Sequence, residues 1–235
     1  MNPGARIACL LLACMTASGG GALRAQEHVR VPAASGDSLD ADLYGSGTRA
    51  VVLAHGGRYD RGSWRPQAEA IAEAGFRVLA FDFRASVASR AGRETACLYD
   101  AACLAADVLS AVRYLRLIGA DEVSVIGASL GGGAAAQAAA VAESGAIERI
   151  VLLAHMPIDA PETIQGRKLF IVSRGDTGGG DVARLPEIRD QYERAPAPKS
   201  LLIIEGTAHA QAIFGTAEGA ELMRAILDFL AMPSP

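Results

Sequence analysis

A single serine lies at the centre of a glycine-rich turn in the middle of the chain. The segment Gly127-Ala128-Ser129-Leu130-Gly131 has the pattern G-x-S-x-G, between an apolar run and an alanine-rich stretch. Flanking glycines allow a sharp turn from a strand into a helix, which exposes the serine hydroxyl. The helix N-terminus there stabilises the negative charge that develops in acyl transfer. We expect Ser129 to be a nucleophile; the alternative is an inert small residue in a tight turn.

A nucleophilic serine needs a general base, and the chain has four histidines, His28, His55, His155 and His209. Where a G-x-S-x-G turn carries the nucleophile, the acid and then the histidine follow it along the chain. Only His155 and His209 follow Ser129, and no acid at a strand end lies between Ser129 and His155. His209 follows the last apolar strand, in a loop that can place the imidazole over the strand ends. His209 is therefore the expected base.

A carboxylate is needed to orient the imidazole, and Asp176 follows the next-to-last apolar run. It would accept the imidazole N–H, hold the tautomer and stabilise the imidazolium. Asp181, beyond a run of three glycines, is the alternative acid. If Asp176 is not catalytic, we expect it to form a weak surface ion pair with Arg174 or Arg184.

An oxyanion hole needs two backbone N–H donors near the nucleophile. Leu130 supplies one by its position after Ser129. For the second we choose the N–H of Gly57, because the loop His55-Gly56-Gly57 follows an earlier strand and its glycines let bare backbone face a substrate. His55 is expected to be structural and to hold this loop by hydrogen bonding.

These residues require a sheet whose strands end at one edge. Short apolar runs alternate with alanine-rich segments of helical spacing, which predicts an α/β fold with a mostly parallel sheet of about eight strands flanked by helices. The expected strands are 28–33, 38–44, 50–55, 77–84, 122–128, 149–155, 168–173 and 200–206, the first two forming an antiparallel hairpin. The expected helices are 64–74, 104–118, 130–143, 185–195 and 218–231. About a dozen residues follow the strand ending at His155, too few for a cap domain.

With these motifs the chain resembles the α/β-hydrolases, especially the compact, cap-less group of dienelactone-hydrolase-like enzymes and small bacterial esterases. The resemblance covers about residues 28–231. It rests on His55-Gly56-Gly57, Phe81-Asp82-Phe83-Arg84, Gly127 to Gly132, Gly175-Asp176 and Gly206-Thr207-Ala208-His209. It implies hydrolysis of a small-molecule ester or related acyl bond through an acyl-serine intermediate, with no cofactor.

The sequence departs from that family in two loops and at the nucleophile. The usual Asp-x-Arg-Gly continues here as Arg84-Ala85-Ser86, and the acid loop is unusually rich in glycine. Some dienelactone hydrolases have a cysteine nucleophile, which Ser129 replaces, so their particular substrate does not carry over.

The N-terminus has the pattern of a secretory signal peptide. Arg6 precedes the apolar run 7–15, and small residues follow. That run is well short of the roughly 20 residues that a membrane span needs. We therefore expect no stable membrane span, cleavage after Ala22 or Ala25, and export to the periplasm or out of the cell. Lipidation of Cys14 is the minor alternative.

Composition bounds the rest. The chain has 235 residues, of which 51% are hydrophobic, enough for one domain (26–235) after a signal peptide (1–25). A net charge of −4 without a basic block gives no sign of nucleic-acid binding, and the oligomeric state stays open. Export would allow a disulfide between Cys97 and Cys103. The alternative is a pair of reduced thiols, and neither cysteine has the spacing of a zinc site.

Other functions remain open on the same fold. His55, His155 and His209 all end predicted strands, so together with Asp176 they could bind zinc, although they lack a local spacing signature. A non-catalytic binding protein on a hydrolase scaffold is a further alternative. Thioesterase, amidase or acyltransferase activity would use the same residues as the esterase. The single Trp64 is expected to pack rather than bind substrate.

Overall fold

The computed structural model describes residues 26–33, 36–93, 97 and 100–233. Their strands form one sheet of eight in the order β1-β2-β4-β3-β5-β6-β7-β8. The predicted hairpin of β1 and β2 is antiparallel, β2 is antiparallel to β4, and all other neighbours are parallel. The strands are β1 (Glu27–Pro32), β2 (Ser38–Tyr44), β3 (Arg49–Ala54), β4 (Arg77–Phe81), β5 (Glu122–Ala128), β6 (Arg149–Leu153), β7 (Arg167–Ser173) and β8 (Lys199–Ile204).

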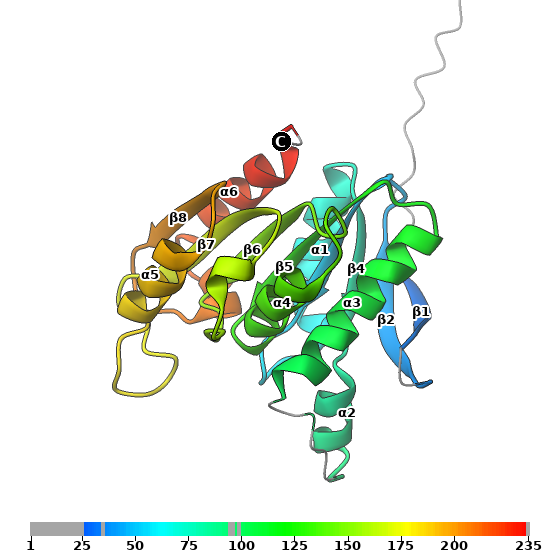
Figure 1. The fold of residues 1–235 in the computed structure, drawn as a ribbon, viewed down its shortest axis with the longest axis horizontal. Coiled ribbons are helices and arrows are strands. Elements are labelled where there is room, and N and C mark those ends of the chain that lie inside the picture. The colour runs from blue at the N-terminus through cyan, green and yellow to red at the C-terminus, as the bar shows by residue number, and fades with distance from the viewer. Residues whose placement is uncertain (1–25, 34–35, 94–96, 98–99, 234–235) are drawn as a thin grey trace, which may run out of the picture.

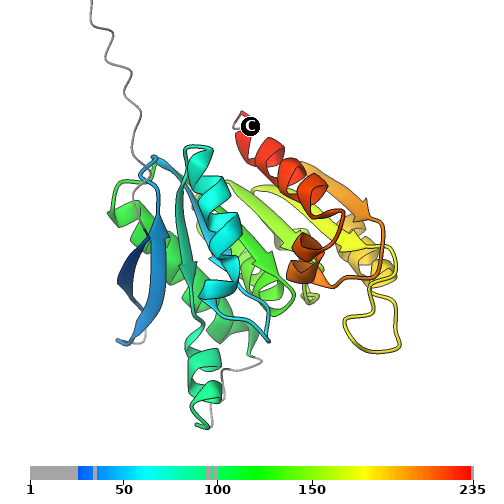
Figure 2. The ribbon, with the colours of Figure 1, turned by 180° about the vertical axis from the view of Figure 1, so that it is seen from behind.

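Helices cover both faces of this sheet. Helices α3, α4 and α5 lie on one face (Figure 1), and α1 and α6 lie on the other (Figure 2). The central strands are therefore buried on both sides, which is why their sequences are continuous aliphatic runs. The helices are α1 (Arg65–Glu73), α2 (Arg84–Arg90), α3 (Ala101–Leu117), α4 (Leu130–Val141), α5 (Leu185–Arg194) and α6 (Gly219–Ala231).

Several predicted strands are too long at their carboxyl ends. The largest error is in β4, which ends at Phe81 and not at Arg84. The apolar run continues to Phe83, but the pairing with β3 ends at Phe81; beyond it the Asp82 carboxylate accepts the backbone N–H of Arg61 at 2.9 Å, and the Asp82 N–H still donates to Asp40 O at 2.9 Å. Arg84 then begins α2, a short helix that hydrophobic periodicity did not predict. Four other strands also end earlier than predicted: β1 ends at Pro32 and not Ala33, β3 at Ala54 and not His55, β6 at Leu153 and not His155, and β8 at Ile204 and not Gly206.

Trp64 packs in the core, as predicted. It closes the 3-10 helix Arg61–Trp64, and α1 begins at Arg65 rather than at Trp64, with a proline in its first turn. The indole is 1% exposed and meets the Phe214 ring edge to face, with the ring centroids 5.9 Å apart. This contact joins the 3-10 helix that precedes α1 to the segment that follows His209.

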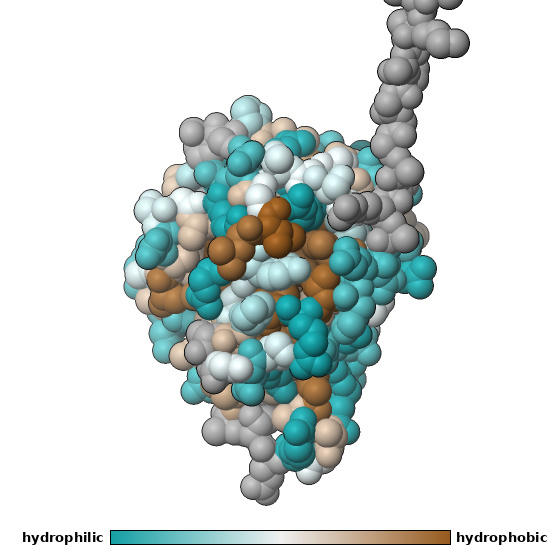
Figure 3. Space-filling view, turned by 90° about the vertical axis from the view of Figure 1, so that its right-hand side faces the viewer, coloured by the Kyte–Doolittle hydropathy of each residue, from teal (hydrophilic) through white to brown (hydrophobic). Residues whose placement is uncertain are grey.

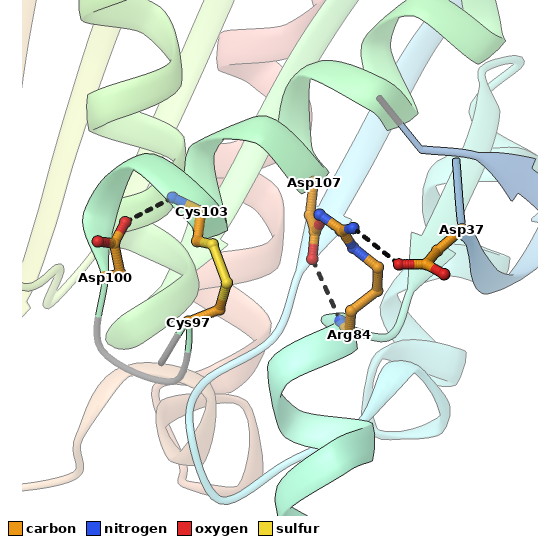
Figure 4. Close-up of a disulfide and its surroundings, with 6 residues drawn as sticks. All are labelled: Asp37, Arg84, Cys97, Asp100, Cys103 and Asp107. Atoms are coloured by element: carbon orange, nitrogen blue, oxygen red, sulfur yellow. Dashed lines mark hydrogen bonds and ion pairs between the residues drawn. A yellow bond between two sulfur atoms is a disulfide. The ribbon is translucent and has the colours of Figure 1, made fainter. Parts of the chain in front are cut away.

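The predicted disulfide between Cys97 and Cys103 is present (Figure 4). It ties the chain that follows α2 to the first turn of α3, where the Asp100 carboxylate caps the helix by accepting the Cys103 N–H at 2.7 Å. Close by, the Arg84 side chain binds Asp107 at 2.8 Å and so joins α2 to α3. A cavity of about 840 Å³ lies beside these groups, and none of the predicted catalytic or oxyanion residues lines it.

The described residues contain no cap domain, since between β6 and β7 they form only the 3-10 helix Pro161–Thr163. None of the described helices is both long and apolar enough to cross a bilayer. The side of the molecule that carries β1 and α3 presents a band of hydrophobic residues among hydrophilic ones (Figure 3). The predicted signal peptide, residues 1–25 with Cys14, Ala22 and Ala25, lies outside the described residues.

Candidate active site

Ser129 occupies the sharp turn between β5 and α4. Its φ of +50° lies in the left-handed region that side chains rarely adopt, and α4 begins at the next residue. Two hydrogen bonds to the end of β6 and the loop after it hold the turn. The Ser129 N–H donates to Leu153 O at 2.9 Å, and the Met156 N–H donates to Ser129 O at 3.0 Å. The strain persists because the end of β6 binds the Ser129 N–H and Met156, in the loop after β6, binds the Ser129 carbonyl.

The glycines around Ser129 are required by close packing. A Cβ on Gly127 would lie 2.4 Å from the carbonyl oxygen of Gly131, and one on Gly131 would lie 2.3 Å from that of Ala54. No real Cβ fits at such distances, so only glycine lets the first turn of α4 lie against the ends of β3 and β5. The motif predicted from the sequence thus has a steric cause.

The structure brings Ser129, His209 and Asp176 together in one hydrogen-bonded chain. The Asp176 carboxylate contacts His209 Nδ1 at 2.8 and 2.9 Å, and His209 Nε2 lies 2.9 Å from Ser129 Oγ. A carboxylate can only accept, so Nδ1 carries the proton and Nε2 is left to accept the serine hydroxyl proton. The imidazole thus has the tautomer that a general base needs.

Burial and partners distinguish Asp176 from the alternative acid. Asp176 has no exposed surface and also accepts the Gly178 N–H at 2.7 Å, whereas Asp181 is exposed. The ion pairs considered for a non-catalytic Asp176 are not observed, because Arg174 binds Glu205 and Arg184 binds Glu187. Asp176 is thus the acid that meets His209.

The two residues expected to supply the oxyanion donors are neighbours in space. Leu130 is the first residue of α4, and a Cβ placed on Gly57 would lie 3.7 Å from Leu130 Cδ2. The carbonyl of Gly56, which shares a peptide plane with the Gly57 N–H, accepts hydrogen bonds from the Tyr59 N–H at 3.0 Å and from His55 Nδ1 at 2.9 Å. These bonds fix the orientation of the plane that carries the Gly57 donor.

His55 has the structural role that the sequence suggests. It is fully buried, its Nδ1 donates to Gly56 O, and its Nε2 accepts the Phe83 N–H at 3.3 Å. Burial lowers the pKa of His55, so the ring stays neutral and keeps one tautomer. His55 therefore joins the end of β3 to the end of β4 rather than entering the reaction.

The third strand-end histidine, His155, lies in the core. Its ring is fully buried and meets Phe170 edge to face at 5.5 Å, and burial lowers its pKa to about 3. Among the described residues, no three His, Cys, Asp or Glu side chains group so that they could hold a metal ion. The arrangement of His55, His155 and His209 thus offers no support for the zinc alternative.

One residue of the site was not predicted to have a role. Gln211, two residues after His209, is buried, and its amide oxygen accepts the Gly56 N–H at 2.7 Å. The sequence alone could not predict this contact, because Gly56 lies 155 residues from Gln211 along the chain.

Comparisons with known proteins agree with this fold. Residues 49–184 match the family model described as alpha/beta hydrolase fold. No curated protein matches the chain. A dienelactone hydrolase from Anabaena variabilis superposes with a TM-score of 0.75 at 23% identity, over 90% of this chain and 99% of that chain.

Two esterases are also similar in structure. The Pyrococcus furiosus esterase Pf2001 has a TM-score of 0.69 at 20% identity, over 88% of this chain and 91% of that chain. An esterase from Exiguobacterium antarcticum has a TM-score of 0.68 at 14% identity, over 88% of this chain and all of that chain. At these identities the structures share the fold, and it is the match to the family model over most of the chain that assigns membership. The chain belongs to the α/β-hydrolase fold family.

Proposed function

We propose that the chain is an exported serine hydrolase that cleaves carboxylic esters of small molecules through an acyl-serine intermediate. The observation that carries the proposal is the hydrogen-bonded chain from Ser129 through His209 to Asp176. The family assignment and the structural similarity to esterases support it. Every group that the reaction requires is on the chain itself.

In the first half of the reaction Ser129 Oγ attacks the ester carbonyl while His209 Nε2 takes its proton. The carbonyl oxygen becomes negatively charged, and the N–H groups of Leu130 and Gly57 stabilise it. His209 then gives the proton to the leaving alcohol, and the acyl group remains on Ser129. Asp176 keeps the imidazole oriented and stabilises its positive charge throughout.

The second half repeats these steps with water. His209 takes a proton from a water molecule, the resulting hydroxide attacks the acyl-serine carbonyl, and the acid leaves as Ser129 recovers its proton. Thioesters, amides or an acceptor alcohol in place of water would use the same groups.

Covalent labelling tests this proposal. A fluorophosphonate probe should label the wild-type protein, Ser129→Ala should lose labelling, and Ser200→Ala, which removes an exposed serine on β8, should keep it. A series of p-nitrophenyl esters of increasing acyl length then gives the substrate preference. A folded wild type that neither takes up the probe nor cleaves any of these esters would favour a binding protein, and loss of activity with a chelator would favour a metal enzyme.

Export is part of the same proposal. The charged, apolar and small-residue segments at the N-terminus support it, and so does the disulfide Cys97–Cys103, since disulfides persist in oxidising compartments. Expression of the full chain in a bacterium, followed by fractionation and N-terminal sequencing, should give a mature protein that begins at Leu23 or Gln26. An intact N-terminus in the cytoplasm would contradict export.

A further inference from the structure

Gln211 is a buried amide that no step of the proposed reaction uses. It lies in the 3-10 helix Ala210–Gly215, directly after His209, and is 7% exposed. Ala210, between His209 and Gln211, has a φ of +48°, so the chain turns sharply after the imidazole. The turn places His209 at the site and Gln211 in the interior beneath it.

The Gln211 amide joins this segment to the loop that follows β3. Its oxygen accepts the Gly56 N–H at 2.7 Å, and its nitrogen donates to Ser63 Oγ at 2.9 Å. A backbone N–H can only donate, so the oxygen must face Gly56, which fixes the orientation of the amide. The segment that carries the base and the loop that carries the second oxyanion donor are thus connected by one side chain.

Gly56 is held at both of its backbone polar groups. Gln211 binds its N–H, while His55 and Tyr59 donate to its carbonyl. The next amide is the N–H of Gly57, which shares a plane with that carbonyl. Glycine has no side chain to restrict its backbone, so these hydrogen bonds set where the Gly57 N–H points.

We propose that Gln211 is a positioning residue that aligns the Gly57 N–H with the oxyanion, and so sets the oxyanion hole relative to His209. The inference rests on the proposed acyl transfer at Ser129. Its consequence is that loss of the Gln211 amide weakens binding of the tetrahedral oxyanion more than binding of the substrate.

Gln211→Met tests this consequence, because methionine has a similar length but cannot accept the Gly56 N–H. We expect kcat for p-nitrophenyl acetate to fall by about tenfold or more, less than the hundredfold or greater loss when an oxyanion donor is removed outright. KM should stay within about threefold. The inhibition constant of a boronic acid, whose serine adduct carries a tetrahedral oxyanion, should rise by the same factor as kcat/KM falls.

Gln191→Met is the matched control. Gln191 is also a buried glutamine, and its amide bridges the backbone N–H and carbonyl of Ile158 at 3.0 and 3.1 Å. Its loss should lower the thermal midpoint while kcat and boronic acid affinity stay near wild type. Gln211→Glu keeps an oxygen that can accept the Gly56 N–H and should restore most of the boronic acid affinity.

Three outcomes would overturn the inference: a Gln211→Met effect on KM alone, unchanged boronic acid affinity, or equal effects of Gln211→Met and Gln191→Met. If Gln211→Met does not fold, Gln211→Asn, which is polar but one methylene shorter, replaces it under the same criteria. Fluorophosphonate labelling of wild-type Ser129 is measured first. Its absence refutes the proposed function, whereas normal labelling with unaltered Gln211 variants refutes only the role of Gln211.

Discussion

The two edges of the parallel part of the sheet differ in which residues have a positive φ: both use glycine, as Gly206 (+98°) does after β8, but among the described residues only the carboxyl-end edge also uses residues with side chains. At the amino-end edge, chain turns that need a positive φ use glycine, as at Gly75 (+92°) and Gly119 (+91°). Among the described residues, three non-glycine residues have a positive φ, Ser129 (+50°), Ala154 (+41°) and Ala210 (+48°), and all three lie at the carboxyl-end edge around the candidate site. The strained backbone and the hydrogen-bonded chain of Ser129 thus occupy the same edge.

This contrast indicates which edge of the sheet is under functional constraint. A non-glycine residue in this region costs about 1–3 kcal/mol and persists only where its surroundings fix it. Ser129 is held by Leu153, and the Ala154 N–H donates to Ile171 O at 2.7 Å. The amino-end turns at Gly75 and Gly119 do not need a side chain at the position of positive φ, and they use glycine, which adopts this φ with the least strain. We interpret the carboxyl-end edge as the part of the sheet where the placement of side chains for function is kept at a cost in folding stability.

Ser129→Gly should give the largest effect, and it should change catalytic activity and folding stability in opposite directions. Activity on p-nitrophenyl acetate should fall about 10⁴-fold or more, because the nucleophile is lost. Stability should rise by about 1 kcal/mol, because glycine adopts a φ of +50° without strain. Urea unfolding measures the second quantity. A variant less stable than wild type would show that the turn is not strained, and the comparison between the edges would fail.

Asp176→Asn should come next, with kcat lower by about 10⁴-fold. An asparagine can donate to the imidazole and so favour the wrong tautomer, and it carries no charge to stabilise the imidazolium. Asp181→Asn is the matched control and should keep kcat within about threefold. The reverse result would transfer the role of the acid to Asp181 and leave the observed contact with His209 unexplained.

Much of this edge could be predicted from the sequence. The serine turn requires glycines at fixed offsets, and the chain order of acid and histidine leaves few choices, so the sequence predicts Ser129 and His209 with Asp176 or Asp181 as the acid; the structure brings Ser129, His209 and Asp176 together. These constraints are local or follow from chain order. The strand centres were predictable for a similar reason, since parallel strands buried on both faces read as aliphatic runs.

The remainder depends on contacts that one sequence does not reveal. Helix α2 was missed because its seven residues have no side-chain cap and follow an apolar run that resembles a longer strand. The bond from Gln211 to Gly56 crosses most of the chain and needs the fold to exist. The disulfide was predictable as a pairing, since only two cysteines follow the predicted signal peptide, but its place beside α2 and α3 was not.

His155 tests the same edge through pH. Its pKa is about 3 in the folded protein, against 6.5 for the ordinary side chain. Below pH 6.5 the unfolded chain therefore binds a proton that the folded protein does not, and stability falls by up to about 1.4 kcal/mol per pH unit until pH approaches 3. In His155→Leu the decline between pH 6 and pH 4 should be smaller by roughly 2–3 kcal/mol.

Urea unfolding of wild type and His155→Leu at several pH values measures this difference. Near pH 7.5 the ring is neutral in both states, so a change there reports packing against Phe170 rather than titration. Parallel curves for the two proteins from pH 7 to pH 4 would show that His155 takes up its proton in the folded state and is not sealed in the core.

The smallest effects should come from two exchanges at positions of positive φ: a glycine replaced by alanine at the amino-end edge, and an alanine replaced by glycine at the carboxyl-end edge. Gly119→Ala should destabilise the protein by about 1 kcal/mol, since a Cβ there meets nothing within 4 Å and only the φ of +91° opposes it. Ala210→Gly relieves a similar strain but removes a methyl group that is 2% exposed, worth about 0.8 kcal/mol, so stability should change little.

The order of the two variants should be reversed for activity: Gly119→Ala, the less stable variant, should be the more active one. Gly119→Ala should keep kcat, because the amino-end turn is remote from Ser129. Ala210→Gly should lower it by a few fold, because a freer backbone between His209 and Gln211 leaves the imidazole less well fixed. If Ala210→Gly is instead clearly more stable and fully active, the strain at the carboxyl-end edge does not serve catalysis, and the contrast between the edges is a consequence of packing alone.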